Sequence, residues 1–400
     1  MLYLLLDWTR TWLIDAGLYR FVSVLDQIQF RALAAAGLSF FFVVMLGRPT
    51  IKWLLRQKIG DAGATDAESL RAHASSKANT PTMGGVLIIG AILGSIALLA
   101  DLRQFYLQLG AIVLIWLAVL GAFDDWLKLT ASRRGTGSRQ GLRAWEKLVF
   151  QIGLGLLVGY FAFLRPEAGL DSVETALAPA IPDVRHVLNL PLQKTYIAPE
   201  MSLNPSLIFL GLGSFITIAV LMITGMSNAV NLADGMDGLA AGTTGAVSLG
   251  LLVLTFIARD QATAQYLLVP YVPDSGELTV LTGAVAGACL GFLWWNCSPA
   301  QVFMGDTGSL ALGGVLAYIG LIIRQEYVVL VMCGIFLLEA GSVALQVGYF
   351  KATKGKRIFR CAPYHHHLHM GGWTEQQVVI RFWIVTVLLV VVGLASIKLR

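Results

Sequence analysis

Four polar residues follow a long apolar run at a constant spacing. Asn228, Asn231, Asp234 and Asp237 come directly after the apolar stretch 216–223 and fall three residues apart. Neighbouring members share one face of an α-helix, and all four line up in a tighter 3₁₀ turn. Carboxylates and amides at the end of a membrane-length helix are costly unless they bind something. We therefore interpret them as substrate-binding residues. An Asx-type turn with a helix cap is the alternative.

Three further acids stand where apolar segments end. Asp124 and Asp125 are consecutive, so helical geometry turns their carboxylates about 100° apart. Asp306 follows apolar residues in Met-Gly-Asp-Thr-Gly-Ser, where an unpaired charge costs roughly 2.5–3.5 kcal/mol. Magnesium suits carboxylates together with substrate phosphates, and we predict a Mg²⁺ site with Asp306 and Asp125 as candidate ligands. The alternative for the consecutive pair is juxtamembrane salt bridges with Lys128 and Lys147.

A lysine and two hydroxyl groups precede the second apolar run. Lys77 comes shortly before Thr80-Pro-Thr-Met-Gly-Gly, and the hydroxyls of Thr80 and Thr82 and the backbone amides of this turn could bind phosphate. The spacing of a P-loop is absent, which excludes that nucleotide-binding signature. The alternative for Lys77 is an anchor at the membrane edge.

A histidine cluster lies near the carboxyl end, in His365-His366-His367-Leu-His369. In an extended chain His365, His367 and His369 share a face. Structural zinc sites take four well-spaced ligands, often with cysteine, so zinc is disfavoured. Phosphate binding or stabilisation of a leaving group fits an acid-rich site better.

The composition defines the class of protein. The chain has 400 residues, of which 56% are hydrophobic and 13% charged, with a mean hydropathy of +0.71, whereas soluble domains are about 25% charged. The net charge of +5 does not indicate nucleic-acid binding, because the basic residues lie in loops between apolar runs, as the positive-inside rule describes. The four cysteines are scattered without a CxxC pair, so neither disulfides nor zinc is indicated.

The apolar runs predict an all-α polytopic membrane protein of about ten transmembrane helices, both termini outside, in one catalytic domain that covers residues 1–400. An amphipathic interfacial segment occupies 1–30, and a cytoplasmic loop at 351–377 carries the histidines. The expected spans are 32–46, 83–100, 105–123, 148–164, 206–226, 238–258, 279–295, 310–323, 328–349 and a last one that ends at the C-terminus.

This topology puts the chemically useful residues on one side of the membrane. The predicted cytoplasmic ends and loops carry Lys77, Asp124, Asp125, Asn228, Asn231, Asp234, Asp237, Asn296, Asp306 and His365–His367. The predicted outer loops carry no comparable cluster. We therefore expect several loops to build one cytoplasmic active site.

With these residues assembled, the chain resembles the phospho-N-acetylmuramoyl-pentapeptide transferase family over nearly its whole length. The triple histidine separates this family from sister hexosamine-1-phosphate transferases. The matching stretches begin at Thr80, Phe123, Asn228, Gly291, Pro299, Leu345, Arg357 and Ala362.

The resemblance implies ten transmembrane helices, a homodimer and a place in the bacterial cytoplasmic membrane. It implies that undecaprenyl phosphate reacts with UDP-N-acetylmuramoyl-pentapeptide to give lipid I and UMP, with Mg²⁺. By position, Asp306 is the implied metal ligand, Asp124 and Asp125 lie beside the lipid phosphate, and Lys77 and Thr82 lie on the pyrophosphate side. The implied nucleotide site comprises Asn231, Asp234, Asp237, Asn296, Phe303 and Gln346. His365 and His366 lie on the implied sugar-phosphate side.

Two positions depart from the family pattern, and several alternatives stay open. Asn79 replaces a common glycine, and Leu368-His369 replaces an aromatic-acid pair. We favour direct attack by the lipid phosphate with Asp124 as base or orienting group, and a covalent aspartyl-phosphate is the rival. A sister transferase that uses UDP-N-acetylglucosamine is the alternative function. A secondary transporter is less favoured, because only Glu339 is a candidate charge near the bilayer midplane.

Overall fold

The computed structural model describes residues 1–56, 80–130, 141–164 and 183–398, so Lys77 and Asn79 lie outside the described residues. Almost all of the described elements are helices. They are α1 (Leu2–Asp15), α2 (Tyr19–Val22), η1 (Ser23–Asp26), α3 (Ile28–Arg56), α5 (Gly85–Leu99), α6 (Phe105–Thr130), α7 (Ala144–Phe163), η5 (Val184–His186), α8 (Leu212–Ala233), α9 (Leu239–Ala258), α10 (Gln261–Tyr266), α11 (Gly276–Asn296), α12 (Gly305–Ile322), α13 (Glu326–Met332), α14 (Gly334–Ala352), α15 (Tyr364–His369) and α16 (Glu375–Lys398).

The predicted all-α polytopic fold is confirmed. Within the described residues, eight helices are long and apolar enough to cross a bilayer, namely α3, α6, α7, α8, α9, α11, α12 and α16. The bent pair α13 and α14 counts as a ninth, and the shorter apolar helix α5 occupies the place of the second expected span. The sides on which the two termini lie remain a prediction.

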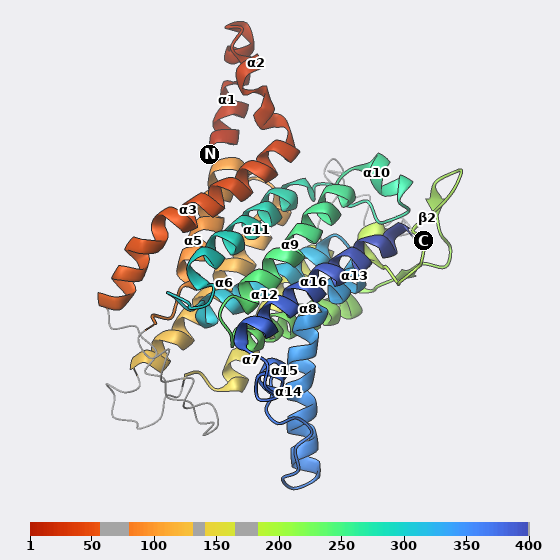
Figure 1. Ribbon diagram of the computed structural model, residues 1–400. Coiled ribbons are helices and arrows are strands. Elements are labelled where there is room, and N and C mark those ends of the chain that lie inside the picture. The colour runs from red at the N-terminus through yellow and green to blue at the C-terminus, as the bar shows by residue number, and fades with distance from the viewer. Residues whose placement is uncertain (57–79, 131–140, 165–182, 399–400) are drawn as a thin grey trace.

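The ninth expected span is not one straight helix. The chain bends by 79° between α13 and α14, and Figure 1 shows α14 leaving the helical bundle instead of continuing through it. The bend falls at Cys333 and Gly334. Both halves are apolar, so hydropathy alone did not show the break.

Two small antiparallel ribbons interrupt the helices before α8. Strand β1 (Val187–Leu188) pairs with β4 (Ile208–Phe209), and β2 (Tyr196–Ile197) pairs with β3 (Ser202–Leu203). The fifth expected span, 206–226, therefore begins too early. Residues 206–210 belong to this strand region, and α8 starts at Leu212 and runs on to Ala233.

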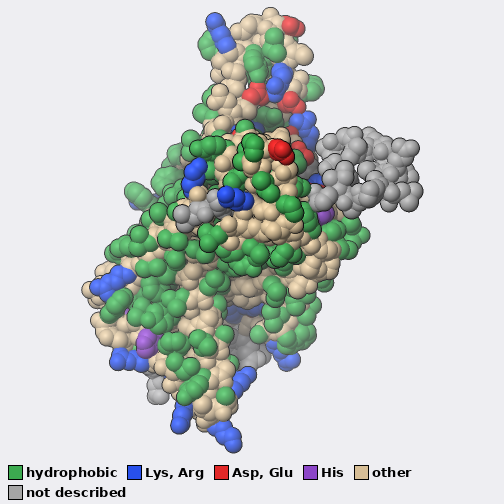
Figure 2. All heavy atoms as spheres, turned by 90° about the vertical axis from the view of Figure 1, so that its right-hand side faces the viewer, with side chains coloured by type: hydrophobic (Ala, Val, Ile, Leu, Met, Phe, Trp, Pro, Cys, Tyr) green, Lys and Arg blue, Asp and Glu red, His purple; other side chains and the backbone are tan. Residues whose placement is uncertain are grey.

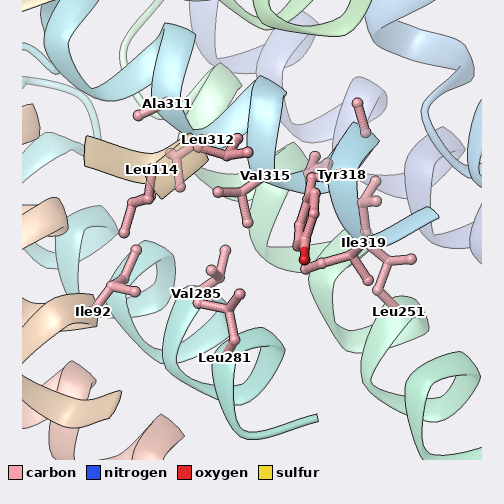
Figure 3. Close-up of a cluster of buried hydrophobic side chains, with 14 of the residues drawn as sticks. Ile92, Leu114, Leu251, Leu281, Val285, Ala311, Leu312, Val315, Tyr318 and Ile319 are labelled. Atoms are coloured by element: carbon pink, nitrogen blue, oxygen red, sulfur yellow. The ribbon is translucent and has the colours of Figure 1, made fainter. Parts of the chain in front are cut away.

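Helix α12 forms the centre of the bundle. Of the residues in its membrane-length segment, 94% are buried. Figure 3 shows its side chains Leu312, Val315 and Ile319 among residues of neighbouring helices. The Tyr318 hydroxyl donates to the Tyr106 carbonyl at 2.5 Å, which ties α12 to α6. Because α12 is surrounded by other helices, its amino-terminal end at Gly305 is held in a fixed position.

Glycines bring helix backbones together where larger residues could not fit. A Cβ at Gly283 or Gly287 of α11 would lie 2.3 or 1.9 Å from a carbonyl oxygen of α3, and one at Gly85 of α5 would lie 2.1 Å from the Gly308 nitrogen of α12. Small residues permit such close helix contacts in membrane proteins. The contact between α5 and α12 also aligns the loop before α5 with the start of α12.

Hydrophobic side chains cover much of the surface. Figure 2 shows them over the middle of one face, with Lys and Arg side chains at its lower end and others in its upper part. At the tip of α14 and just after it, Lys351, Lys354, Lys356, Arg357 and Arg360 are exposed. Helices α1 and α2 project from the opposite end (Figure 1), and Trp8 is 83% exposed. The interfacial role predicted for 1–30 remains a prediction.

Candidate active site

Asp125 caps the amino-terminal end of α12. Its Oδ1 accepts the Asp306 backbone N–H at 3.1 Å, and its Oδ2 accepts the N–H and the hydroxyl of Thr307 at 3.0 and 2.7 Å. A carboxylate in this position satisfies orphan donors and complements the helix dipole. The carboxyl end of α6 is thereby joined to the start of α12. Asp125 therefore has a structural task, and its role as a metal ligand remains a prediction.

Two lysines hold the carboxylates of Asp124 and Asp306 together. The Lys147 Nζ lies 2.7 Å from Asp124 Oδ2 and 2.6 Å from Asp306 Oδ2. The Lys128 Nζ lies 2.7 and 3.1 Å from the same two atoms. The Asp124 side chain is fully buried, and that of Lys147 is 16% exposed. Two acids and two ammonium groups therefore form one compact, charge-balanced cluster at the ends of α6, α7 and α12.

The end of α8 completes this cluster. Asn231 donates from Nδ2 to Asp306 Oδ1 and to the Ser309 hydroxyl, both at 2.9 Å. The Asp234 carboxylate faces the backbone N–H of Gly305, and burial together with the Asp306 and Asp125 charges raises the pKa of Asp234 well above its usual value. A Cβ built on Gly305 would lie 3.0 Å from the Thr82 hydroxyl, so Thr82 also borders the start of α12.

Two other predicted residues, Asp237 and Asn296, hydrogen-bond neighbouring loops to each other. Asp237 accepts the Ala300 N–H at 3.1 Å, and its own backbone N–H donates to Glu375 at 3.2 Å. Asn296 accepts the Gly238 N–H at 3.0 Å and donates to the Val302 carbonyl at 2.8 Å. These bonds lock the turn between α8 and α9 against the loop between α11 and α12.

The loop before α5 is fixed to the loop before α12 through the backbone of Phe303. The Phe303 N–H donates to the Pro81 carbonyl, and its carbonyl accepts the Gly84 N–H, both at 2.8 Å. The side chains of Thr82 and Phe303 are half-buried beside these contacts. The pairing places the Thr82 turn next to the start of α12, and the phosphate-binding role of Thr82 remains a prediction.

His365 reaches the same region from the other end of the chain. Its Nδ1 lies 3.0 Å from Glu339 Oε2, and its backbone N–H donates to Glu339 Oε1 at 3.2 Å. A Cβ built on Gly235 would lie only 2.4 Å from His365 Nε2. The Glu339 carboxylate of α14 therefore orients the imidazole so that Nε2 faces the turn that follows Asp234.

The histidines lie in helix α15 and not in an extended chain, so the arrangement in which His365, His367 and His369 would share one face is not adopted. Pro363 is the N-cap residue of this helix. Helical geometry turns alternate residues to different sides. The ring of His366 lies against that of His365, with centroids 4.1 Å apart. His367 accepts the Arg360 N–H at 3.1 Å and stacks on Tyr364. His369 lies 2.9 Å from the Trp373 carbonyl.

Gln346 and Asn228 contact protein groups in the described structure. Gln346 accepts the N–H groups of Ile358 and Phe359 at 3.0 and 2.9 Å, which fixes the loop after α14. Asn228 donates to Gln151 of α7 and to the Thr224 carbonyl, both at 2.8 Å. Their predicted contacts with substrate remain predictions.

Sequence reasoning missed the importance of Lys128, Lys147 and Glu339. The sequence suggests the two lysines only as possible salt-bridge partners of Asp124 and Asp125. It suggests Glu339 only as a charge near the bilayer midplane, as a transporter would need. Lys128 follows Asp124 by four residues, a spacing that places both on one helix face. That spacing was the available signal, whereas the approach of Lys147 and Glu339 depends on tertiary packing.

The donor set fits a hard divalent cation. Carboxylates of Asp124, Asp125, Asp234 and Asp306 converge within hydrogen-bonding networks around the start of α12. Among the described residues, no group of three or more His, Cys, Asp or Glu side chains is already arranged to enclose a metal ion. Mg²⁺ is usually held by one or two carboxylates plus substrate phosphates and water, so such an enclosure is not required.

The bundle and its site define a membrane-embedded transferase of the glycosyl transferase family 4 class, because the model of that family matches residues 107–324. A second model, phospho-N-acetylmuramoyl-pentapeptide-transferase signature 1, matches residues 77–89. These matches cover α6 to α12 and the turn that carries Thr82.

Full-length relatives give the particular family. Phospho-N-acetylmuramoyl-pentapeptide-transferase of Desulfotalea psychrophila is 40% identical over 94% of this chain and 96% of the relative. The proteins of the same name from Thermodesulfovibrio yellowstonii and Chloroherpeton thalassium are 40% and 39% identical, over 95% and 100% of this chain and 96% and 100% of theirs. The chain belongs to the phospho-N-acetylmuramoyl-pentapeptide-transferase family.

Proposed function

We propose that this protein transfers phospho-N-acetylmuramoyl-pentapeptide from its UDP conjugate to undecaprenyl phosphate, giving lipid I and UMP. Family membership supports the choice of reaction. The observation that carries the chemistry is the pair of lysines that joins Asp124 to Asp306 at the start of α12. The two ammonium groups of this cluster can turn from the carboxylates towards incoming phosphates.

The proposed reaction forms one bond and breaks one. An oxygen of the lipid phosphate attacks the phosphorus that carries the sugar, and the bond from this phosphorus to the oxygen that bridges it to the UMP phosphorus breaks. UMP leaves with the electron pair. Phosphoryl transfer depends mainly on positioning and charge stabilisation. Lys128 and Lys147 would neutralise the two anionic substrates, and Asp124 would orient the lysines and the attacking phosphate.

Mg²⁺ is the proposed cofactor, with Asp306 and Asp125 as candidate ligands and Asp234 beside them. When bound, the ion would supply electrostatic stabilisation of the pyrophosphate and of departing UMP. At the amino-terminal end of α12 the helix dipole would favour phosphate independently of the ion. His365, held by Glu339, would lie on the side of the Asp234–Gly235 turn.

The decisive experiment measures UMP release by the purified protein with undecaprenyl phosphate and either UDP-N-acetylmuramoyl-pentapeptide or UDP-N-acetylglucosamine. We expect release with the first donor only. Release with UDP-N-acetylglucosamine instead would establish the sister transferase activity. Release with neither donor, from folded protein supplied with Mg²⁺, would contradict the proposal.

We propose direct attack instead of a covalent enzyme intermediate. The Asp124 side chain is fully buried, its Oδ1 accepts the Leu142 N–H at 2.6 Å, and its Oδ2 contacts both lysines. A carboxylate held in this way is a poor nucleophile because attack would break these contacts. Isolation of phosphorylated Asp124 during incubation with donor alone would overturn direct attack while leaving the overall reaction intact.

The protein is an integral membrane protein, and we propose the bacterial cytoplasmic membrane as its location, with the active site facing the cytoplasm. The exposed basic residues after α14 support this orientation through the positive-inside rule. We also propose a homodimer, by family resemblance. Cross-linking in native membranes would test the dimer separately from activity.

A further inference from the structure

A buried amide joins α7 to α8 one helical turn away from the charged cluster. The Gln151 side chain of α7 is fully buried. Its Nε2 donates to the Ser227 hydroxyl at 2.9 Å, and its Oε1 accepts a hydrogen bond from Asn228 Nδ2 at 2.8 Å. Both partners belong to α8. Because an amide without partners is costly inside a membrane-length helix bundle, these two bonds hold the helices together at this height.

Gln151 belongs to a row of α7 residues, four apart, that faces α8. Lys147 precedes it in this row, and Gly155 and Gly159 follow. A Cβ built on Gly155 would lie 2.7 Å from the Val220 Cα, and one on Gly159 would lie 2.8 Å from another Cα of α8. Glycine permits this close contact, but it has no side chain that could fix how far one helix slides along the other. The directional bonds of Gln151 supply that restraint.

Helix α8 is the fixed member of this pair, because it is tied to the central helix α12. Asn231 of α8 donates to Asp306 Oδ1 and to the Ser309 hydroxyl, both at 2.9 Å. A Cβ built on Gly313 of α12 would lie 2.5 Å from the Met226 carbonyl oxygen of α8. Helix α7 is more peripheral, since 33% of its membrane-length segment is buried, against 94% for α12.

The height of α7 along α8 decides where the Lys147 ammonium lies. Asp306 is contacted from both helices, by Lys147 Nζ at 2.6 Å from Oδ2 and by Asn231 Nδ2 at 2.9 Å from Oδ1. Gln151 follows Lys147 by four residues, about 6 Å along the same helix. A slide of α7 by 1 Å would therefore move the base of the Lys147 side chain by about the same distance relative to Asp306.

We infer that Gln151 is a positioning residue for the transfer reaction, which holds the Lys147 ammonium at Asp124 and Asp306 by fixing α7 against α8. This inference rests on the proposed function, in which Lys147 neutralises the anionic substrates. Gln151 is buried between the helices and acts through Lys147. The Asn228 amide shares this task, because it supports Gln151 from the other helix.

The first test removes the two bonds at nearly constant volume. Gln151→Met should lower kcat for UMP release about tenfold or more, since misplacement by about 1 Å can cost about 100-fold in rate, and should leave both KM values nearly unchanged. Thr386→Val on α16 is the matched control. It removes a buried hydroxyl whose bond to the Phe382 carbonyl, at 2.8 Å, stays within one helix, and it should keep the parental kcat.

The second test separates positioning from a general loss of structure. If Gln151 acts through Lys147, Gln151→Met added to a Lys147→Met chain should lower kcat by less than about twofold further. A further fall as large as the one in the parent chain would show a merely structural role and overturn the inference. A parental kcat in folded Gln151→Met would also overturn it.

A swap of the two amides covers the case in which Gln151→Met does not fold. Gln151→Asn shortens the bridge by one methylene group, and Asn228→Gln lengthens it by one. We expect each single variant to lower kcat and the two together to restore it to within about threefold of the parental value. A double variant as slow as the product of the two single effects would overturn the inference.

Failure of the proposed function gives a different result. If the parent protein releases no UMP from either donor, the proposed function fails and this inference fails with it. If the parent is active and the Gln151 variants match the Thr386→Val control, the positioning role alone fails.

Discussion

Individual residues that are predicted to bind substrate also hold the protein together. Asp125 caps α12, and Asp237 and Asn296 tie neighbouring loops. Their residue types and positions near helix ends were visible in the sequence. Their partners were not, because a backbone N–H from a distant loop carries no sequence signal. A carboxylate that completes a cap and one that binds a cation look the same in a motif.

The lysine pair gives a prediction at this scale. Lys147→Met leaves Asp124 and Asp306 with Lys128 as their remaining ammonium contact among the described residues. Loss of a preorganised charge should lower kcat by about 100-fold or more. Lys351→Met, at an exposed position of α14, is the control and should retain parental kcat. A folded Lys147→Met protein with parental kcat would remove Lys147 from the mechanism.

The contact between Gly235 and His365 gives a second prediction. In Gly235→Ala the new methyl group would lie 2.4 Å from His365 Nε2 and displace the imidazole. Misplacement by about 1 Å can cost about 100-fold in rate, so we expect a large fall in kcat in a steady-state UMP assay. Gly225→Ala, where a Cβ meets no other atom within 4 Å, is the matched control. Equal activity of the two variants would show that the His365 position does not matter.

At the scale of elements, the apolar runs predicted most helices and missed their interruptions. The apolar run 328–349 predicts one span, since nothing in Met332-Cys-Gly marks a bend of 79°. The fifth predicted span begins six residues before α8, because Ile208 and Phe209 are as apolar in a strand as in a helix. Tertiary packing decided each case.

The contact between α5 and α12 gives a prediction for stability. In Gly85→Ala the added Cβ would lie 2.1 Å from the Gly308 nitrogen, and such overpacking typically costs about 1–3 kcal/mol. We expect a lower midpoint of thermal unfolding in detergent micelles. Gly90→Ala, on α5 and without a neighbour within 4 Å, should keep or raise the midpoint. A parental midpoint in Gly85→Ala would mean that the two helices can separate at little cost.

For the whole molecule, composition and hydropathy predicted the class of fold, whereas the orientation rests on loop charge. The native cysteines offer a test. Cys297, in the loop between α11 and α12, is exposed, and it lies on the side predicted to face the cytoplasm. A membrane-impermeant thiol reagent should label it in permeabilised cells and not in intact cells.

The opposite side supplies the control for this test. Ser206→Cys lies at an exposed position before β4, in the region predicted to be outside, and should react in intact cells. If Cys297 reacts in intact cells and the Ser206→Cys thiol does not, the predicted orientation is inverted. The reaction at the site would then require a donor on the other side of the membrane.

Removal of divalent cations gives the last prediction. Acids crowd the start of α12, and the incoming phosphates add negative charge. Chelation should therefore abolish UMP release, and added Mg²⁺ should restore it. Calcium prefers more ligands and longer bonds and should restore it poorly. Full activity in excess chelator would contradict the metal site.

The bend between α13 and α14 bears on the surrounding bilayer. Helix α13 has seven residues, about 10 Å at the usual rise, which is far less than a hydrocarbon core of about 30 Å. Helix α14 leaves the bundle at this bend (Figure 1), so α13 and α14 do not follow one straight path across a bilayer. We expect the length of the host acyl chains to affect how α14 sits and, through it, how well Glu339 holds His365.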